Sequence, residues 1–250
     1  MNLNIDPTAG LVWRNHFRRN LFEELAPRSR DPWGPGEREL LGPSLAQFQL
    51  GESSDGRHLL RYAREFGEAT GDAWLGEAMA LFIQEENRHS QYLGEFLRAQ
   101  GYPLLRHCWT DAVFRAVRKP LGFGLMVAVL ACAEIVAVPY YSAVRTYTSS
   151  GWLRSICTRL LTDEAMHLRF QASNLGRVWK RRPGLRALRW AHKGFLAAVC
   201  AAVWWDHGRV LRAGGYTRLT FLSACLDLLD ELYAAQEMRV DQLAPARSNG

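Results

Sequence analysis

The sequence predicts an all-α protein, and two observations support this prediction. Apolar residues recur every three or four positions through long segments, which is the period of a helix with one buried face. No alternation of apolar and polar residues, which would indicate a strand, persists along the chain. Four long helical segments, with a long connection between the second and the third, predict a four-helix bundle with one crossover.

Turn residues separate the expected helices. The first long helix follows Pro43, with Ser44 as its N-cap, and ends near Gly67. The connection over residues 102–120 is expected to contain a short helix at 111–118. The expected long helices span residues 44–67, 72–101, 121–147, 152–178, 185–212 and 217–239.

The chain divides into three parts around this bundle. Proline and glycine are concentrated in residues 26–36, so residues 1–43 are expected to form an irregular N-terminal arm with a short helix near 11–25. Residues 44–180 are expected to form the bundle itself. The two helices of residues 185–240 are expected to pack on the bundle as a C-terminal extension.

The segment 121–144 has two interpretations. It contains a single charged residue, Glu134, and is long enough to span a membrane. A glutamate is costly inside lipid, however, and needs a partner or a function there. A helix buried on all sides within the bundle explains the same apolar run without lipid, and this interpretation is favoured.

Composition limits the classes of protein to which the chain can belong. A chain of 250 residues with 48% hydrophobic residues is neither a disordered tail nor a disulfide-stabilised miniprotein. The five cysteines form no Cys-x-x-Cys pair, and the first residues lack the pattern of a secretory signal, so a cytoplasmic location is expected.

The net charge of +6 comes mainly from arginine, since only three of the 31 basic residues are lysines. Arginine suits contacts with carboxylate or phosphate groups. The basic segment 177–193, which includes Trp179 and Trp190, is either a solvated helix boundary or a contact with a membrane surface or an anionic carrier. No nucleic-acid-binding module is present, so no nucleic-acid partner is expected.

Two motifs carry the chemistry. Glu86 and His89, and likewise Glu164 and His167, form Glu-x-x-His motifs, and each motif lies within a strongly periodic helical segment. Residues three apart lie on one face of a helix, about 5–6 Å from each other, so the carboxylate and the imidazole can bind the same metal ion.

Two lone glutamates complete the pattern. If consecutive helices form antiparallel hairpins, Glu52 lies level with Glu86, and Glu134 lies level with Glu164, because the midpoint of each pair falls in a predicted turn. Four carboxylates would neutralise two divalent ions. A binding metal would also explain how Glu134 is tolerated in an apolar helix.

The candidate ligands therefore combine carboxylate and imidazole donors, which suit iron or manganese. Glu52 is the least constrained of them, because the glycine-rich segment around it is also compatible with a loop. Glu65 and Asp55 are the alternatives to Glu52. The expected ligands are Glu52, Glu86, His89, Glu134, Glu164 and His167.

Over residues 44–178, this ligand pattern resembles the ferritin-like di-iron carboxylate superfamily, which includes ferritins, rubrerythrins, the ribonucleotide reductase small subunit, bacterial multicomponent monooxygenases and para-aminobenzoate N-oxygenase. In the reductase and monooxygenase branches an acidic residue often precedes the Glu-x-x-His motif and holds the opposite histidine. Glu85 and Asp163 occupy these places. The resemblance implies that Asp163 accepts a hydrogen bond from His89, and Glu85 one from His167. The alternative is that both acids are solvated.

The resemblance also implies a function. The expected protein binds two iron ions, with manganese as the alternative metal, and uses dioxygen to oxidise a small or carrier-bound organic substrate. An electron donor protein is an expected partner, and a homodimer and a peripheral membrane contact are both possible. The apolar wall around the oxidant is expected to consist of Leu125, Val129, Val138 and Leu160.

Two other classes of function stay open. One is a ferritin-like, rubrerythrin-like or manganese-catalase-like protein that oxidises ferrous ion or consumes peroxide. The absence of a Cys-x-x-Cys rubredoxin module and the two additional helices count against the first two of these. The other is a metal-free helical protein that binds a partner or a membrane surface. In such a protein, the position of four carboxylates at the same height of the bundle would have to be a coincidence.

Overall fold

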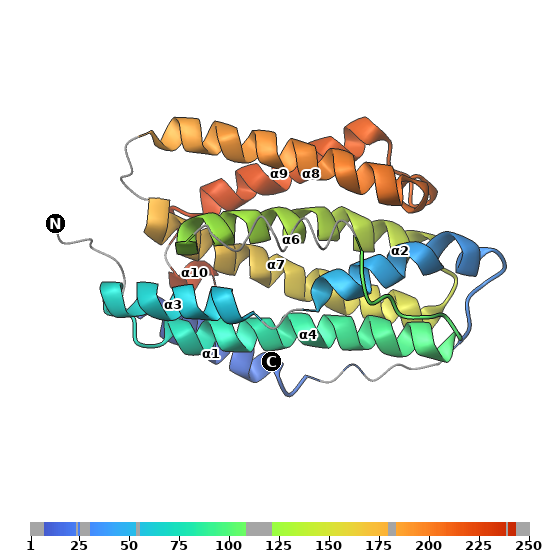
Figure 1. Cartoon of the computed structure of the whole chain (residues 1–250), viewed down its shortest axis with the longest axis horizontal. Coiled ribbons are helices and arrows are strands. Elements are labelled where there is room, and N and C mark those ends of the chain that lie inside the picture. Colours follow the sequence, from blue (N-terminus) through green and yellow to red (C-terminus); the bar gives the residue numbers. More distant parts are fainter. Residues whose placement is uncertain are drawn as a thin grey trace.

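The computed structural model of the chain describes residues 8–23, 25, 31–53, 56–108, 122–179, 184–238 and 240–243. This part of the chain is helical and contains no strand (Figure 1). The prediction of an all-α protein is therefore confirmed. The helices are α1 (Ala9–Asn20), α2 (Glu37–Glu52), α3 (Arg57–Thr70), α4 (Leu75–Ala99), α6 (Gly122–Tyr147), α7 (Gly151–Trp179), α8 (Leu185–Ala213), α9 (Arg218–Ala235) and α10 (Val240–Leu243).

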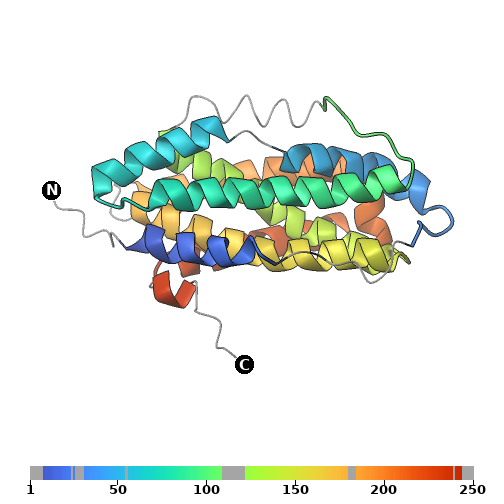
Figure 2. The same cartoon turned by 90° about the horizontal axis from the view of Figure 1, so that it is seen from below.

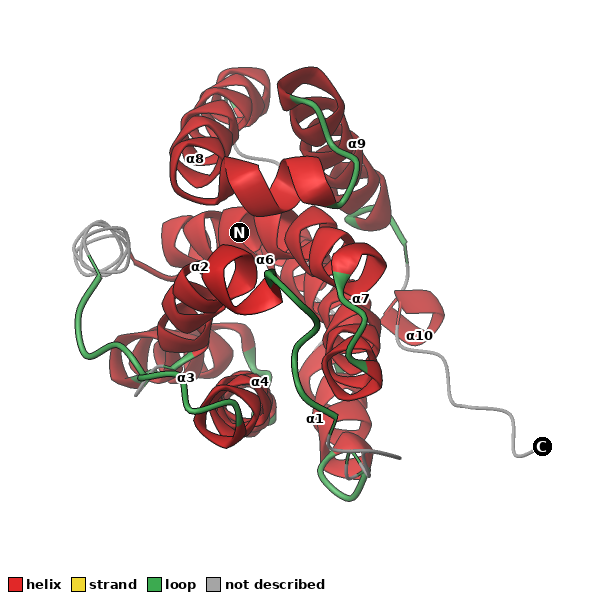
Figure 3. Cartoon of the chain, turned by 90° about the vertical axis from the view of Figure 1, so that its right-hand side faces the viewer, coloured by secondary structure: helices red, strands yellow, loops and turns green. Residues whose placement is uncertain are grey.

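The helices are stacked in layers. Viewed end-on, α8 and α9 lie over α6 and α7, while α1 and α4 lie on the opposite side (Figure 3). From below, α4 runs beside α1, with α2 and α3 along its other side (Figure 2). The helices α4 and α7 contact each other across the middle, so residues on their facing sides are removed from solvent.

The apolar helix α6 is the central element of the core. It packs along α7 and also contacts α3, α8 and α9. By length and composition it is the one helix in the described part of the chain that could cross a membrane, yet 72% of its most apolar window is buried inside the protein. This packing agrees with the interpretation of residues 121–144 as a buried core helix.

The first bundle helix begins earlier than expected. Ser44 was predicted to be its N-cap, but α2 begins at Glu37 and continues through Pro43, which costs the helix one backbone hydrogen bond. Ser44 lies within α2, and its hydroxyl is 2.8 Å from the Tyr140 hydroxyl and 2.8 Å from Nδ1 of His207. The serine therefore joins α2 to α6 and α8 instead of capping a helix.

The helix expected over residues 44–67 is two helices. The first, α2, ends at Glu52, and α3 begins after Gly56, which has φ of +58°. A Cβ atom at Gly56 would lie 2.4 Å from Cδ1 of Ile83 on α4. Glycine is required here because it allows both the left-handed conformation and the close approach to α4.

The expectation of an irregular arm over residues 1–43 also needs correction. In the described part of this region, α1 packs along α4, and the Gly10 amide donates a hydrogen bond of 2.9 Å to the Asp72 carboxylate. Glu37, the first residue of α2, accepts a hydrogen bond of 2.6 Å from the backbone amide of Ser149 in the turn between α6 and α7. The N-terminal region is thus bonded to both halves of the bundle.

The C-terminal helices lie close to their expected positions. Expected over residues 185–212 and 217–239, they extend from Leu185 to Ala213 in α8 and from Arg218 to Ala235 in α9, and they pack on α6. The short helix expected at residues 111–118 lies outside the described residues.

Part of the basic segment 177–193 is used inside the protein. Arg177 forms an ion pair of 2.9 Å with Asp72, and Trp179 is buried. Trp190, by contrast, is 75% exposed on α8. Within the described residues, the segment is therefore partly structural and partly open to solvent.

Candidate metal centre

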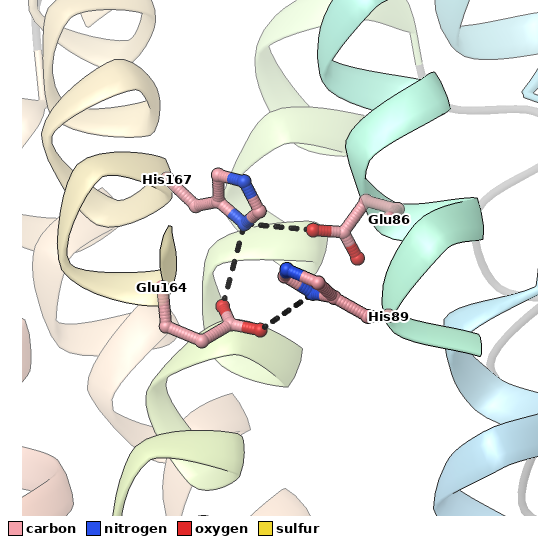
Figure 4. A group of neighbouring side chains, drawn as sticks. All are labelled: Glu86, His89, Glu164 and His167. Carbon is pink, nitrogen blue, oxygen red and sulfur yellow. Dashed lines mark ion pairs between the residues drawn. The ribbon is translucent and has the colours of Figure 1, made fainter. Parts of the chain in front are cut away.

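The two Glu-x-x-His motifs meet in the interior of the bundle. Glu86 and His89 project from α4 toward Glu164 and His167 on α7 (Figure 4). One ligand atom from each of the four residues can be chosen so that all four atoms lie within 4.8 Å of one another. His89, Glu164 and His167 are fully buried, and Glu86 is partly buried.

The inward-facing atoms of the two histidines approach carboxylate oxygens without hydrogen bonds. Nδ1 of His167 lies 2.7 Å from Oε1 of Glu86 and 3.6 Å from Oε2 of Glu164. Nδ1 of His89 lies 3.7 Å from Oε1 of Glu164. Both Nδ1 atoms, Oε1 of Glu86 and Oε2 of Glu164 are buried and have no hydrogen-bond partner. Buried polar atoms are rarely left in this state, and a cation held between these four residues would give them partners.

Each histidine is oriented from its other ring nitrogen. Nε2 of His89 lies 3.1 Å from Oδ2 of Asp163, and Nε2 of His167 lies 3.0 Å from Oε2 of Glu85. A carboxylate only accepts hydrogen bonds, so each Nε2 donates, and the lone pair of a neutral ring is left on Nδ1. The crossed pairing implied by the resemblance is present, and neither acid is solvated.

Glu52 also reaches this centre, although it lies outside the group of four. It is the last residue of α2 and is buried, and the negative charges of Glu86 and Glu164 act on its carboxyl group. The hydroxyl of Tyr141 on α6 donates a short hydrogen bond to it. Of the two alternatives, Glu65 is exposed and pairs with Arg61, and Asp55 lies outside the described residues.

Glu134 approaches the centre from α6. Its side chain is buried, and Oε1 accepts a hydrogen bond of 2.8 Å from the amide nitrogen of Gln171, while Oε2 has no partner. The electrostatic influence of Glu86, Glu164 and His167 acts on its carboxyl group. The structure therefore brings four of the six expected ligands into one tight group, and the charges of this group act on the buried carboxyl groups of Glu52 and Glu134.

The carboxylates that hold the histidines are fully paired on their outer side. Oε1 of Glu85 accepts a hydrogen bond of 2.6 Å from Arg88, and Oδ2 of Asp163 accepts one of 2.7 Å from Arg159. Asn20 donates to the same two acids, at 2.9 Å to Glu85 and 3.3 Å to Asp163. Arg159 also forms an ion pair of 3.0 Å with Glu23, so this outer group contains three acids and two arginines.

Protonation equilibria follow from these contacts. Burial opposes ionisation of Asp163, but the hydrogen bond with His89 and the positive charges nearby outweigh burial and lower the pKa of Asp163 to about 2. Burial likewise opposes ionisation of Glu85, and the hydrogen bond and charge of His167 outweigh it, so the pKa of Glu85 is also lowered. Both acids are therefore ionised at neutral pH.

The inner carboxyl groups behave in the opposite way. Burial, together with repulsion from neighbouring glutamates, raises the pKa of Glu52 and Glu134 well above the usual value and also raises that of Glu164. Within the described residues, no arginine or lysine forms an ion pair with these groups or with Glu86. The positive charge near the inner group comes from the histidines: burial opposes ionisation of Glu86, but the charges of His167 and His89 outweigh burial and lower the pKa of Glu86.

The residues present fit a pair of divalent metal ions. Four carboxylates and two imidazoles provide oxygen and nitrogen donors and no thiolate, which suits iron or manganese. Two such ions would neutralise four carboxylates and would give the unpartnered Nδ1 and Oε atoms their missing partners.

Two phenylalanine rings lie beside His167. The ring of Phe82 lies 4.8 Å from the ring of His167, and the ring of Phe17 lies 6.0 Å from it. Leu125 of the expected wall is 42% exposed, whereas Leu160 is buried. Phe17 belongs to α1, in the region for which no role near the site was expected.

Sequence reasoning missed three polar residues that touch the candidate ligands or their partners. They are Asn20, Tyr141 and Gln171. Gln171 lies one helical turn beyond His167 and Tyr141 two turns beyond Glu134, so the helical period could have identified these two. No pattern in the sequence points to Asn20.

Comparison with known proteins adds no assignment. No protein-family model, curated protein or solved structure matches the chain. The functional argument therefore rests on the residues of this site and on their geometry.

Proposed function

We propose that the chain is a ferritin-like, non-haem di-iron protein that uses dioxygen to oxidise a small or carrier-bound organic substrate. The observation that carries the proposal is the set of unpartnered ligand atoms that converge in the interior, above all the Nδ1 atoms of His89 and His167. Both histidines present the lone-pair nitrogen inward because a buried carboxylate holds the other nitrogen.

The order of the helices supports the ferritin-like part of the proposal. One helix pair consists of α2 with α3, followed by α4, and the other consists of α6 and α7. Each pair contributes one lone glutamate and one Glu-x-x-His motif, which is the ligand arrangement of di-iron bundle proteins. The long connection between α4 and α6 corresponds to the crossover of such bundles.

The residues of the chain have distinct roles in this proposal. Bound ferrous ions would supply open coordination positions and electrons for the reduction of dioxygen. His89 and Glu86 from α4, and His167 and Glu164 from α7, each provide one nitrogen and one carboxylate donor. The phenylalanine rings around His167 keep water away from this side of the centre. An electron donor protein would return the site to its reduced state.

Metal analysis of the purified protein tests the site directly. We expect close to two metal ions per chain, and we expect His89→Ala and His167→Ala each to lose most of the metal, since each removes a nitrogen donor. His58→Ala removes an exposed histidine of α3 and serves as the control. Unchanged metal content in both variants would contradict the site.

The reaction with oxygen tests the chemistry. Ferrous protein mixed with oxygenated buffer is expected to develop a transient visible absorption that the two histidine variants lack. Two bound manganese ions with consumption of peroxide would indicate a catalase-like protein instead. Assembly into a hollow particle that stores many irons would indicate a ferritin.

A further inference from the structure

Asn20, the last residue of α1, joins the two acids that orient the histidines. Its amide nitrogen lies 2.9 Å from Oε1 of Glu85 and 3.3 Å from Oδ1 of Asp163. The residue is only 6% exposed. Its backbone carbonyl accepts a hydrogen bond of 2.9 Å from Arg88. One residue of the N-terminal region is therefore bonded to α4 and α7 at the height of the centre.

An amide is chemically suited to this place. A side-chain amide has two N–H donors on one nitrogen and can bind two carboxylates without adding charge. Glu85 and Asp163 already have Arg88 and Arg159 as charged partners, so the additional donor between the two acids can be a neutral amide. An apolar side chain would leave one oxygen of each acid without this donor.

Contacts at a distance from Asn20 also fix the position of α1. At its other end, the Gly10 amide donates to Asp72, and a Cβ at Gly10 would lie only 2.3 Å from Oδ1 of that residue. Between the two ends, Phe17 packs against Phe82 and Phe170 in the core. The helix therefore holds Asn20 rigidly against the two acids.

We propose that Asn20 is a positioning residue for both halves of the metal centre, since its amide fixes Glu85 and Asp163 relative to each other and, through them, the inward orientation of His167 and His89. This inference rests on the proposed metal site. It assigns to α1 a part in building the centre, although α1 lies outside the helix pairs that supply the ligands.

Cobalt binding provides the test. Co²⁺ is titrated into metal-free wild-type protein, Asn20→Ala and the isosteric Asn20→Asp, with visible absorption as the readout. We expect both variants to bind the two Co²⁺ ions about 10–100-fold more weakly and with altered absorption at both binding steps. Asn15→Ala, on an exposed position of α1, is expected to behave like the wild type.

Single-acid variants show whether Asn20 acts through both histidines. Glu85→Gln is expected to affect mainly the ion bound by His167, and Asp163→Asn mainly the ion bound by His89, whereas Asn20→Ala is expected to affect both. A merely structural residue would lower the unfolding temperature of the metal-free protein and leave Co²⁺ affinity and absorption unchanged. That result in either Asn20 variant would overturn the inference.

The outcomes separate this inference from the proposed function. Wild-type protein that takes up no Co²⁺ would overturn both. Wild-type uptake of two ions with unchanged uptake in the Asn20 variants would overturn the role of Asn20 and leave the metal site intact. If Asn20→Ala does not fold, Asn20→Leu, which keeps the approximate size of the side chain and adds no charge, gives the same comparison.

Discussion

Among single residues, Glu134 shows how one carboxyl group can be accommodated in the apolar centre of α6. Gln171 donates to one of its oxygens, and the other oxygen has no partner. Burial raises the pKa of Glu134 well above its usual value, so burial favours the protonated form of the group. A metal ion would replace this proton and would leave the hydrogen bond from Gln171 in place.

The variant Gln171→Leu tests whether the hydrogen bond from Gln171 orients the carboxylate of Glu134 for metal binding. It is expected to weaken metal binding about 10–100-fold, because the carboxylate loses the donor that fixes its orientation. The helix itself should persist, since leucine is a strong helix former. Isothermal titration with Mn²⁺ measures the effect, and Gln91→Leu on the exposed face of α4 is the control. Equal affinities in the two variants would contradict the role of Gln171.

Among the helices, the break between α2 and α3 is a structural requirement for the position of Glu52. Glu52 is the last residue of α2, and its carboxyl group is under the influence of the charge of Glu86. The chain then passes close to Ile83 at Gly56. A continuous helix could not make this close approach, because a residue with a Cβ atom would collide with α4.

The variant Gly56→Ala tests this requirement. It is expected to destabilise the protein by about 1–3 kcal/mol, through the positive φ and the contact with Ile83. Gly51→Ala is the matched control, because no atom lies within 4 Å of a Cβ at Gly51 in α2, and this change is expected to stabilise the helix by up to about 1 kcal/mol. Urea unfolding measures both changes. Similar stabilities would show that the turn tolerates an ordinary residue.

The helices differ in how far the sequence predicts them. In the segments that form α4, α6 and α7, apolar residues recur without interruption, so the bounds of these helices can be predicted from the local sequence. The break after Glu52 cannot be predicted from the local sequence, because it depends on a contact with Ile83 on another helix. The position of α1 is likewise set by distant partners, including Asp72, and no local pattern encodes such contacts.

The same distinction holds for the candidate site. Each Glu-x-x-His motif has a fixed spacing on one helix, and the structure brings the two motifs together. Hairpin symmetry identifies Glu52 and Glu134, whose carboxyl groups are buried and are influenced by the charges of this group. Asn20 lies 143 residues from Asp163 along the chain, and neither spacing nor symmetry relates the two. Residues that bind ligands can therefore be predicted here, whereas a residue that positions them from another layer cannot.

For the molecule as a whole, the stability of the metal-free protein is expected to decrease as pH rises from about 5 to 8. The pKa values of Glu52, Glu134 and Glu164 are raised on folding, and so are those of His89 and His167. A raised pKa stabilises the fold while the group is protonated, and this contribution is lost as pH rises through the folded-state value.

Bound metal should reverse this trend. Divalent ions bind the deprotonated ligands, so the increase in unfolding temperature on adding Mn²⁺ is expected to grow as pH rises over the same range. Differential scanning calorimetry at several pH values, with and without the metal, measures it. An increase that stays constant with pH would argue against binding through these buried groups.

The outer acids, Asp163 and Glu85, are expected to have the opposite effect on the pH dependence of stability. Asp163 and Glu85 have lowered pKa values in the folded protein, so their contribution to stability is present at neutral pH and is lost as pH falls below about 4. Asp163→Asn is expected to reduce the acid dependence of unfolding, because it removes the group with the lowest pKa. Acid titration followed by circular dichroism provides the comparison.

The bond between Asn20 and Asp163 has a consequence for the synthesis of the protein. A growing chain emerges from the ribosome N-terminus first, so α1 leaves the tunnel long before the 143 residues that separate it from its partner on α7 have been made. Closing so long a loop costs conformational entropy and is slow compared with the formation of a single helix. The bond between Asn20 and Asp163 can therefore form only after the chain has been translated through most of α7.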